Sequence, residues 1–475
     1  MRMAVRKPDL ALLTAFLVAA AGFMELLDTT VITTAIPRMA TSFGVHPVDL
    51  NLGVTAYMIM LAAGIPLSGW AAERFGTRTI FASAILIFTV ASALCGLADG
   101  LWEFFAARIL QGLGGAMMVP VGRLVVMRVT PKAELMRATA LITWPALVAP
   151  ILGPVVGGFL TTYASWRWIF FLNVPIGLAG LVATLLIIRN DRSERLRKLD
   201  VPGALLSGFA AIAFVYGASL AGTASGNLGW SLGLMLLGGL GAWGTAVHAK
   251  RARAPLVEFS ALAIPSFRAT LRGGSLIRLG INAAPFLLPL LFQLGFHRSP
   301  VEAGSLLLVL FVGNLAIKPL TTPMMRRFGF RRVLIINGLI LAFTFLGFAL
   351  LNDATPAWFL LPLLLVSGMA RSTQFTAMNT LAYADIPAER MTSANTLFNL
   401  GQQVAFGLGV AVGAILLRLG HGLLGGDQIT VADFHFAFAG TFLLSLLGVA
   451  DFLALPAGAG ANVSGHQAKG LGAAR

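Results

Sequence analysis

The sequence of 475 residues is poor in charged residues and contains a single cysteine. Only 11% of its residues are charged and 57% are hydrophobic, whereas soluble domains contain about 25% charged residues. A soluble protein of this size needs charged side chains to cover its surface, so the composition indicates a chain embedded in a bilayer. The lone Cys95 excludes an intramolecular disulfide and a metal site of the CxxC type.

Acidic residues are also scarce, since 34 Lys and Arg face 19 Asp and Glu and give a net charge of +15. In a soluble protein this charge would suggest a nucleic-acid partner. Here the basic residues lie in short loops between apolar runs, as the positive-inside rule describes, so we expect no nucleic acid. HExxH, GxxxxGK[ST] and nucleophile-elbow motifs are missing from the sequence. We therefore expect no enzyme activity, no cofactor and no bound metal.

Fourteen apolar segments are long enough to cross a bilayer, because a span needs about 20 mostly apolar residues. They predict an all-α membrane protein with two six-helix bundles and two additional linking spans. The predicted spans are residues 10–37, 50–73, 79–98, 102–128, 137–162, 168–189, 201–222, 228–248, 269–296, 303–325, 332–352, 357–384, 392–419 and 435–456.

Basic residues gather in alternate loops when the N-terminus is placed in the cytoplasm. The outside loops then hold only Arg38, Arg167, Arg298 and Arg418. This bias continues in phase along the whole chain, so the even number of spans predicts that both termini are cytoplasmic.

Four regions follow from this organisation. An N-terminal six-helix bundle is predicted for residues 1–189, and a cytoplasmic linker with two extra spans for residues 190–268. A C-terminal six-helix bundle covers residues 269–456, and residues 457–475, rich in Gly and Ala, form a disordered cytoplasmic tail.

Two loops of the predicted bundles carry the same short pattern. Residues 74–78 read Arg-Phe-Gly-Thr-Arg after the second span, and residues 327–331 read Arg-Phe-Gly-Phe-Arg after the tenth. Each loop joins the second and third span of its six-span block. The repeat indicates two related halves, which is typical of secondary transporters.

Four stretches of the sequence carry a family resemblance. The first-span stretch runs from Leu27 to Pro37 and has Thr33 where Asn is frequent. The loop stretch contains Gly69, Glu73 in place of the usual Asp, Arg74, Gly76 and Arg78. The fourth-span stretch contains Arg108, Gln111, Gly112, Gly114 and Gly115. The fifth-span stretch contains Gly153, Pro154, Gly157 and Gly158, with Ala149 where a further Gly is common.

Together these stretches resemble the fourteen-span drug:proton antiporter family of the major facilitator superfamily, in its MdtD-like branch. The resemblance covers about residues 10–456. It implies a multidrug-type exporter that exchanges small molecules for protons across the bacterial inner membrane by alternating access. We expect the protein to work in the lipid bilayer as a monomer.

The loop and fifth-span motifs each have a functional and a purely structural interpretation. Glu73 could pair with a basic residue or cap a helix of the other bundle, and so hold a gate closed. Arg74 and Arg78 are also explained as solvated positive-inside charges. The small residues of the fifth-span motif permit close helix packing, and Pro154 permits a bend. Such packing would shape the pocket of an exporter, or simply join two helices.

Charged residues inside spans are the most informative, since each costs about 2.5–3.5 kcal/mol at the bilayer centre. Glu25 and Asp28 lie three residues apart on one helical face. Arg108 enters its span to a depth comparable with that of Asp28, which predicts an Asp28–Arg108 pair. Our hypothesis is that Glu25 or Asp28 carries the coupling proton, and the alternative is a permanent structural ion pair.

Polar residues in other spans are candidates for the substrate cavity. These candidates are Gln111, Arg278, Arg371, Gln374 and Asn399. Because basic residues outnumber acids within the spans, an exporter of organic anions such as carboxylates competes with the drug exporter. A helical membrane protein without transport, such as a receptor or membrane enzyme, is the alternative from a different class.

Overall fold

The computed structural model describes residues 7–45, 47–131, 134–143, 145–190, 198–222, 227–425 and 429–466. Within these ranges the chain forms helices and turns and no strand. Helices are the expected outcome of long apolar runs, because a helix satisfies its own backbone hydrogen bonds in hydrocarbon.

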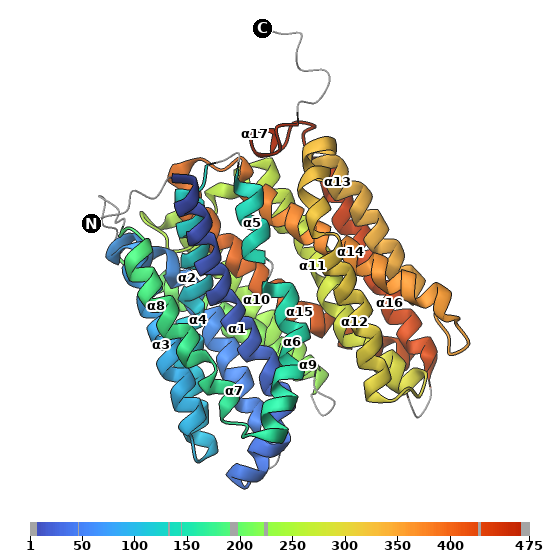
Figure 1. Cartoon of the computed structure of the whole chain (residues 1–475). Coiled ribbons are helices and arrows are strands. Elements are labelled where there is room, and N and C mark those ends of the chain that lie inside the picture. The colour runs from blue at the N-terminus through green and yellow to red at the C-terminus, as the bar shows by residue number, and fades with distance from the viewer. Residues whose placement is uncertain are drawn as a thin grey trace.

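The N-terminal helices form one side of the molecule in Figure 1. They are α1 (Lys7–Phe43), α2 (Asn51–Phe75), α3 (Thr77–Leu97), α4 (Leu101–Val129), α5 (Leu135–Thr143), α6 (Pro145–Tyr163), α7 (Trp168–Phe171) and α8 (Asn173–Ile187). Two further helices, α9 (Val201–Gly222) and α10 (Leu228–Arg251), follow. The C-terminal helices are α11 (Pro265–Leu290), α12 (Pro300–Ala316), α13 (Lys318–Phe348), α14 (Ala357–Ala384), α15 (Met391–Leu424), α16 (Val431–Leu453) and the short α17 (Ala461–Ser464).

Eleven helices of the described residues are long and apolar enough to cross a membrane, by length and composition. The other three predicted spans fall on α5 with α6, on α12 and on α14. α12 has only 17 residues, and the second half of α14 is polar from Arg371 onward. The many membrane-length helices agree with an all-α membrane protein, and the count of fourteen spans stays a prediction.

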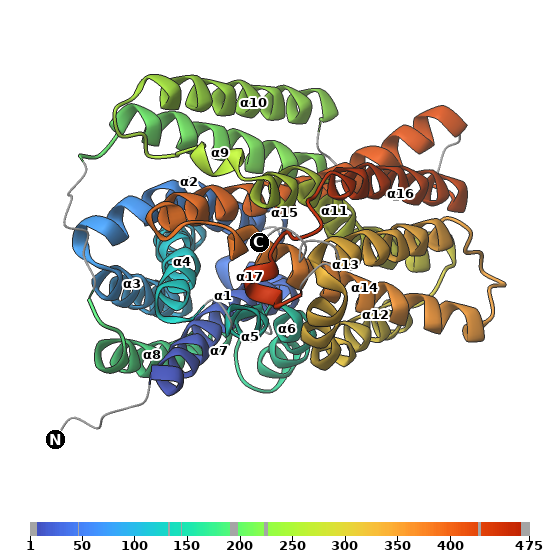
Figure 2. The ribbon, with the colours of Figure 1, turned by 90° about the horizontal axis from the view of Figure 1, so that it is seen from above.

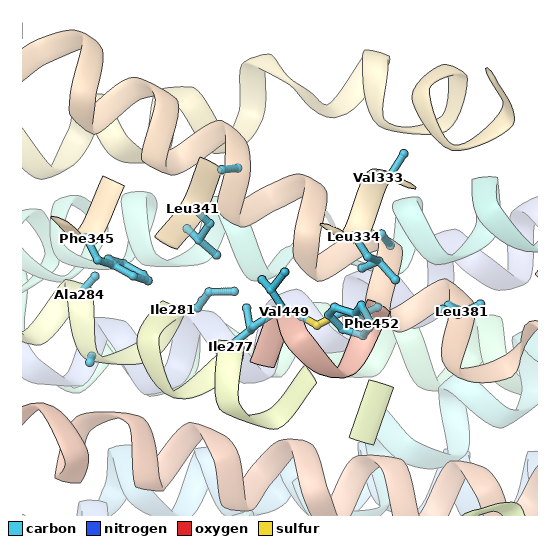
Figure 3. Close-up of a cluster of buried hydrophobic side chains, with 14 of the residues drawn as sticks. Ile277, Ile281, Ala284, Val333, Leu334, Leu341, Phe345, Leu381, Val449 and Phe452 are labelled. Atoms are coloured by element: carbon cyan, nitrogen blue, oxygen red, sulfur yellow. The ribbon is translucent and has the colours of Figure 1, made fainter. Parts of the chain in front are cut away.

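The C-terminal helices share a hydrophobic core, shown in Figure 3. It joins side chains of α11, α13, α14 and α16, including Ile277, Leu341, Phe345, Val449 and Phe452. This core positions α11 and α14, which carry Arg278 and Arg371.

The helix pair α9 and α10 lies at the outer edge of the molecule, beside α2 and α15 (Figure 2). The carboxylate of Asp200, just before α9, accepts hydrogen bonds from the backbone of Gly203 at 3.0 Å and Leu256 at 3.1 Å. It also contacts Nε2 of His248 at 2.8 Å. Burial raises the pKa of Asp200, but these hydrogen bonds outweigh it and lower the pKa below its usual value. Asp200 therefore joins the start of α9 to the end of α10 and to the segment before α11.

The two repeated loops have the same backbone geometry. Gly76 has φ 93° and ψ 144°, and Gly329 has φ 74° and ψ 161°, a conformation that is essentially restricted to glycine. A Cβ at Gly76 would lie 2.1 Å from the side chain of Asn190, and one at Gly329 would lie 2.7 Å from His466. Each loop is thus covered by the chain segment that follows its own bundle.

The helix boundaries around Gly329 differ from the prediction of spans at residues 303–325 and 332–352. Helix α12, which corresponds to the first of these two spans, already ends at Ala316. Helix α13 then runs from Lys318 to Phe348 with a kink at Gly329. Pro319 explains the early break, because proline lacks the amide hydrogen that a continuing helix requires.

The tail also differs from the expectation of disorder from residue 457 onward. Residues 457–466 contain α17, in which Val463 and Ser464 are buried. The backbone of Gly460 donates to the carboxylate of Asp385, and Gly460 and Gly465 have positive φ angles that turn the chain. Glycine here permits a compact turn rather than disorder. Residues 467–475 lie outside the described ranges.

Candidate functional site

The predicted pair of Asp28 and Arg108 is present and lies between α1 and α4. Nη1 of Arg108 is 2.7 Å from Oδ2 of Asp28, and both side chains are almost completely buried. The other carboxylate oxygen accepts from Nε2 of Gln111 and from Nδ2 of Asn173, each at 2.9 Å. Asp28 therefore accepts hydrogen bonds from α4 and α8 at once.

Three residues of this cluster, Asn173, Tyr57 and Ser92, were not identified from the sequence. Asn173 begins α8, and the ring of Tyr57 from α2 lies 4.3 Å from the guanidinium carbon of Arg108. In the sequence, these residues stand out only as polar side chains within apolar segments. Gln111 accepts from Arg108 at 2.6 Å and donates to Ser92 at 2.8 Å, and its place in the substrate cavity stays a prediction.

Glu25 lies on the same helix but outside this hydrogen-bond network. Its side chain is buried, and Oε2 has no hydrogen-bond partner among the described residues. Gly115 of α4 packs beside it, since a Cβ there would lie 3.5 Å from the carboxyl carbon of Glu25 and only 2.9 Å from Cδ1 of Leu61. The two carboxylates of α1 thus have opposite environments.

The fifth-span motif lies on α6 and packs against α1. A Cβ at Gly153 would be 2.2 Å from Oγ1 of Thr30, and one at Gly157 would be 2.7 Å from the backbone oxygen of Val31. Gly158 has open space around it. Only the backbone of Pro154 is described, within α6.

Replacing Gly157 by alanine is expected to destabilise the protein by about 1–3 kcal/mol, because the added methyl group forces α6 away from α1. Gly158→Ala is the matched control and should change stability by less than about 0.5 kcal/mol. Thermal unfolding of the purified proteins in detergent measures both. Equal melting temperatures for the two variants would contradict the close packing of Gly157.

The loop motif brings the end of α2 to the start of α15. A Cβ at Gly69 would lie 2.4 Å from Oγ1 of Thr396, and Glu73 lines a small cavity together with Thr392 and Ser393. Arg74 is exposed and lies over the ring of Phe75. Glu73 is therefore placed beside the N-terminus of a C-terminal helix, and its role in gating stays a prediction.

Further polar contacts join the two groups of helices near the same end. Arg123 of α4 donates to Oδ1 of Asn399 at 3.0 Å and to Oε1 of Gln402 at 3.2 Å, both on α15. Asn395 donates to the backbone oxygen of Pro120 at 2.9 Å. Asn399, a predicted cavity residue, is therefore part of a contact between the two groups. A cavity of about 10 Å3 beside it is lined by Arg123 of α4 and by residues of α5 and α14.

The remaining cavity candidates lie within the C-terminal helices. Arg278 is 1% exposed, donates to the backbone oxygen of Thr270 at 3.0 Å and lies 5.0 Å from the ring centre of Phe398. Gln374 is bonded to Asn337 at 2.9 Å.

The cations Arg278, which is buried, and Lys318 and Arg371, which are half-buried, lack acidic partners. Nη1 of Arg371 is buried without a hydrogen bond, and Lys318 donates to Thr376 at 2.8 Å. In the described part of the chain, neither of them nor Arg278 forms an ion pair. This region therefore carries uncompensated positive charge.

Comparisons with known proteins agree with this arrangement. The MdtD proteins of Salmonella paratyphi B and Cronobacter sakazakii, which carry the name multidrug resistance protein, are 37% and 38% identical to this chain. The matches cover 95% and 93% of this chain and 94% and 92% of the relatives.

Solved structures share the fold at low sequence identity. The human organic anion transporter MFSD10 matches with a TM-score of 0.65 at 15% identity, over 93% of this chain and 99% of that one. The proton:xylose symporter XylE matches with a TM-score of 0.65 at 16% identity, over 96% of this chain and 98% of the symporter chain. The sequence profile of the Major Facilitator Superfamily matches residues 18–410 and, a second time, residues 270–469. The chain therefore belongs to the Major Facilitator Superfamily.

Proposed function

We propose that this protein exports small molecules in exchange for protons, by alternating access between two six-helix bundles. Its family and its MdtD relatives make it a secondary transporter of the multidrug-efflux type. The observation that favours proton coupling is the buried cluster of Asp28, Arg108 and Glu25. Ionisable residues within membrane spans commonly mark proton relays.

The proposed topology has fourteen spans, with both termini in the cytoplasm of a bacterial cell. The N-terminal bundle comprises residues 1–189, the linker and extra spans residues 190–268, and the C-terminal bundle residues 269–456. The basic loops support this orientation. The start of α1 and α17 lie at the same end of the molecule, at the top of Figure 1, and we call it the α17 end.

The proposed conformation is outward-facing. The polar contacts of Arg123 and Asn395 between the bundles, and the close packing of Gly69 on Thr396, lie where α15 begins, toward the α17 end. With that end in the cytoplasm, these contacts close the inner side of the transport path. A substrate can be released outward only when this side is closed.

Uptake into everted membrane vesicles tests the proposed function. A lipophilic cationic dye such as ethidium should accumulate when a proton gradient is imposed, and a protonophore should abolish the accumulation. Vesicles without the protein supply the background. Dye uptake that is the same with and without the proton gradient would contradict proton antiport.

The buried Arg278 and the half-buried Lys318 and Arg371 favour a second candidate function, the export of organic anions such as carboxylates. Arg278, Lys318 and Arg371 lack acidic partners, and a substrate carboxylate would supply the missing charge. In that case Arg278→Gln should lower gradient-driven citrate uptake at least about tenfold, the equivalent of about 1.4 kcal/mol. Arg251→Gln, which alters an exposed cation at the end of α10, is the matched control. Citrate uptake that is absent, or unchanged by Arg278→Gln, would exclude this candidate.

A further inference from the structure

We propose that Glu25 carries the coupling proton, while Asp28 stays ionised as the counterion of Arg108. This inference rests on the proposed proton antiport and assigns its proton to one carboxylate. It follows from the different environments of two residues that lie three positions apart on α1.

Asp28 has every feature of a carboxylate that remains ionised. It accepts three hydrogen bonds, from Arg108 at 2.7 Å and from Gln111 and Asn173 at 2.9 Å. Protonating Asp28 would leave the guanidinium of Arg108 buried without a counterion, because only Nη1 contacts a carboxylate and Nε and Nη2 have no hydrogen-bond partner among the described residues. Removing one partner of a buried ion pair is strongly unfavourable, so the pair keeps its charges.

Glu25 has the opposite features. It is only 8% exposed, its Oε2 accepts no hydrogen bond, and it is the one glutamate among the described residues that is buried. An ionised carboxylate without a partner is very costly in such a setting, so Glu25 is neutral in this conformation. The nearby negative charge of Asp28 favours the neutral form further.

Tyr57 lies near both carboxylates. Its hydroxyl is buried. A Cβ placed on Gly115 would lie 3.2 Å from this hydroxyl and 3.5 Å from the carboxyl carbon of Glu25, so the two groups flank the same point of α4. The ring of Tyr57 also stacks on Arg108. A small shift of α2 against α1 would let the hydroxyl donate to an ionised Glu25 and so favour proton release.

The charged and titratable groups around Glu25 are few. They are Asp28 on α1, Tyr57 on α2 and Arg108 on α4, and Cys95 on α3 lies on the far side of this group, beside Gln111. Of the other helices that pack on α1, α6 and α8 contain no charged residue, and Arg137 of α5 is exposed. Glu25 is protonated in the conformation proposed to be outward-facing, which is where an exporter must take up its proton.

Infrared spectroscopy of the protein reconstituted in liposomes tests the assignment. A pH-difference spectrum should contain the carbonyl band of a protonated carboxylic acid, and Glu25→Gln should remove this band. In the wild-type protein, labelling all aspartates with carbon-13 at the side-chain carboxyl should leave the frequency of this band unchanged. This measurement does not depend on any variant being folded. Glu103→Gln, which alters an exposed glutamate of α4, should retain the band.

A band that survives Glu25→Gln, or that shifts with labelled aspartate, would overturn the assignment. Ethidium uptake by the same liposomes separates this result from the proposed function. Gradient-driven uptake together with an aspartate band would refute only the assignment to Glu25. A Glu25 band in a protein that moves nothing with the gradient would refute proton antiport and retain Glu25 as the buried protonated group.

Discussion

Replacing Asp28 by asparagine is expected to abolish gradient-driven uptake into everted vesicles. The substitution leaves Arg108 buried without its counterion, and breaking a buried pair in this way costs about 3–5 kcal/mol. It also removes the carboxylate that orients Gln111 and Asn173. We therefore expect a smaller amount of folded protein and no coupled transport by the protein that remains.

A double variant separates stability from function. Asp28→Asn with Arg108→Gln removes both charges and should restore much of the folded protein, because no uncompensated charge is left in the core. Transport should stay absent, since the ion pair is gone. Asp353→Asn, in an exposed loop, is the matched control and should behave like the wild type. Normal gradient-driven uptake by Asp28→Asn would contradict the role of the pair.

A disulfide between cysteines at positions 69 and 396 is expected to form and to stop transport completely. The Cβ of a residue at position 69 would lie 3.7 Å from the Cβ of Thr396. Disulfides have Cβ–Cβ distances of about 3.5–4.5 Å, so the geometry fits without movement of the helices. The bond would join α2 to α15 and hold the α17 end closed. Native Cys95 is fully buried and should not take part.

Hydropathy and charge placed most of the helices correctly, because spanning helices must be long, apolar and bounded by basic loops. The Asp28–Arg108 pair also followed from the sequence, since depth in the bilayer can be counted from the end of each span. The echo of residues 74–78 in residues 327–331 corresponds to a shared backbone geometry, since both loops place glycine at a positive φ.

Contacts between distant helices could not be predicted in the same way. Asn173 of α8 donates to Asp28, which lies 145 positions away in the sequence. The spacing of residues within one helix cannot predict a contact of this kind. Gln111 and Asn399 were assigned to the cavity because polar residues in spans often line one. The structure places Gln111 in the ion-pair cluster and Asn399 in the contact between bundles. Which neighbour a polar side chain meets depends on helix packing, not on helical periodicity.

The disulfide between positions 69 and 396 gives the most direct test of alternating access. The measurement is ethidium uptake by the oxidised double-cysteine protein, before and after addition of a reductant, with each single-cysteine variant as a control. We predict no uptake while the disulfide is intact and recovery to the level of the reduced protein once it is cleaved. Undiminished uptake by fully cross-linked protein would contradict the account, because transport would then proceed without opening the contact between α2 and α15.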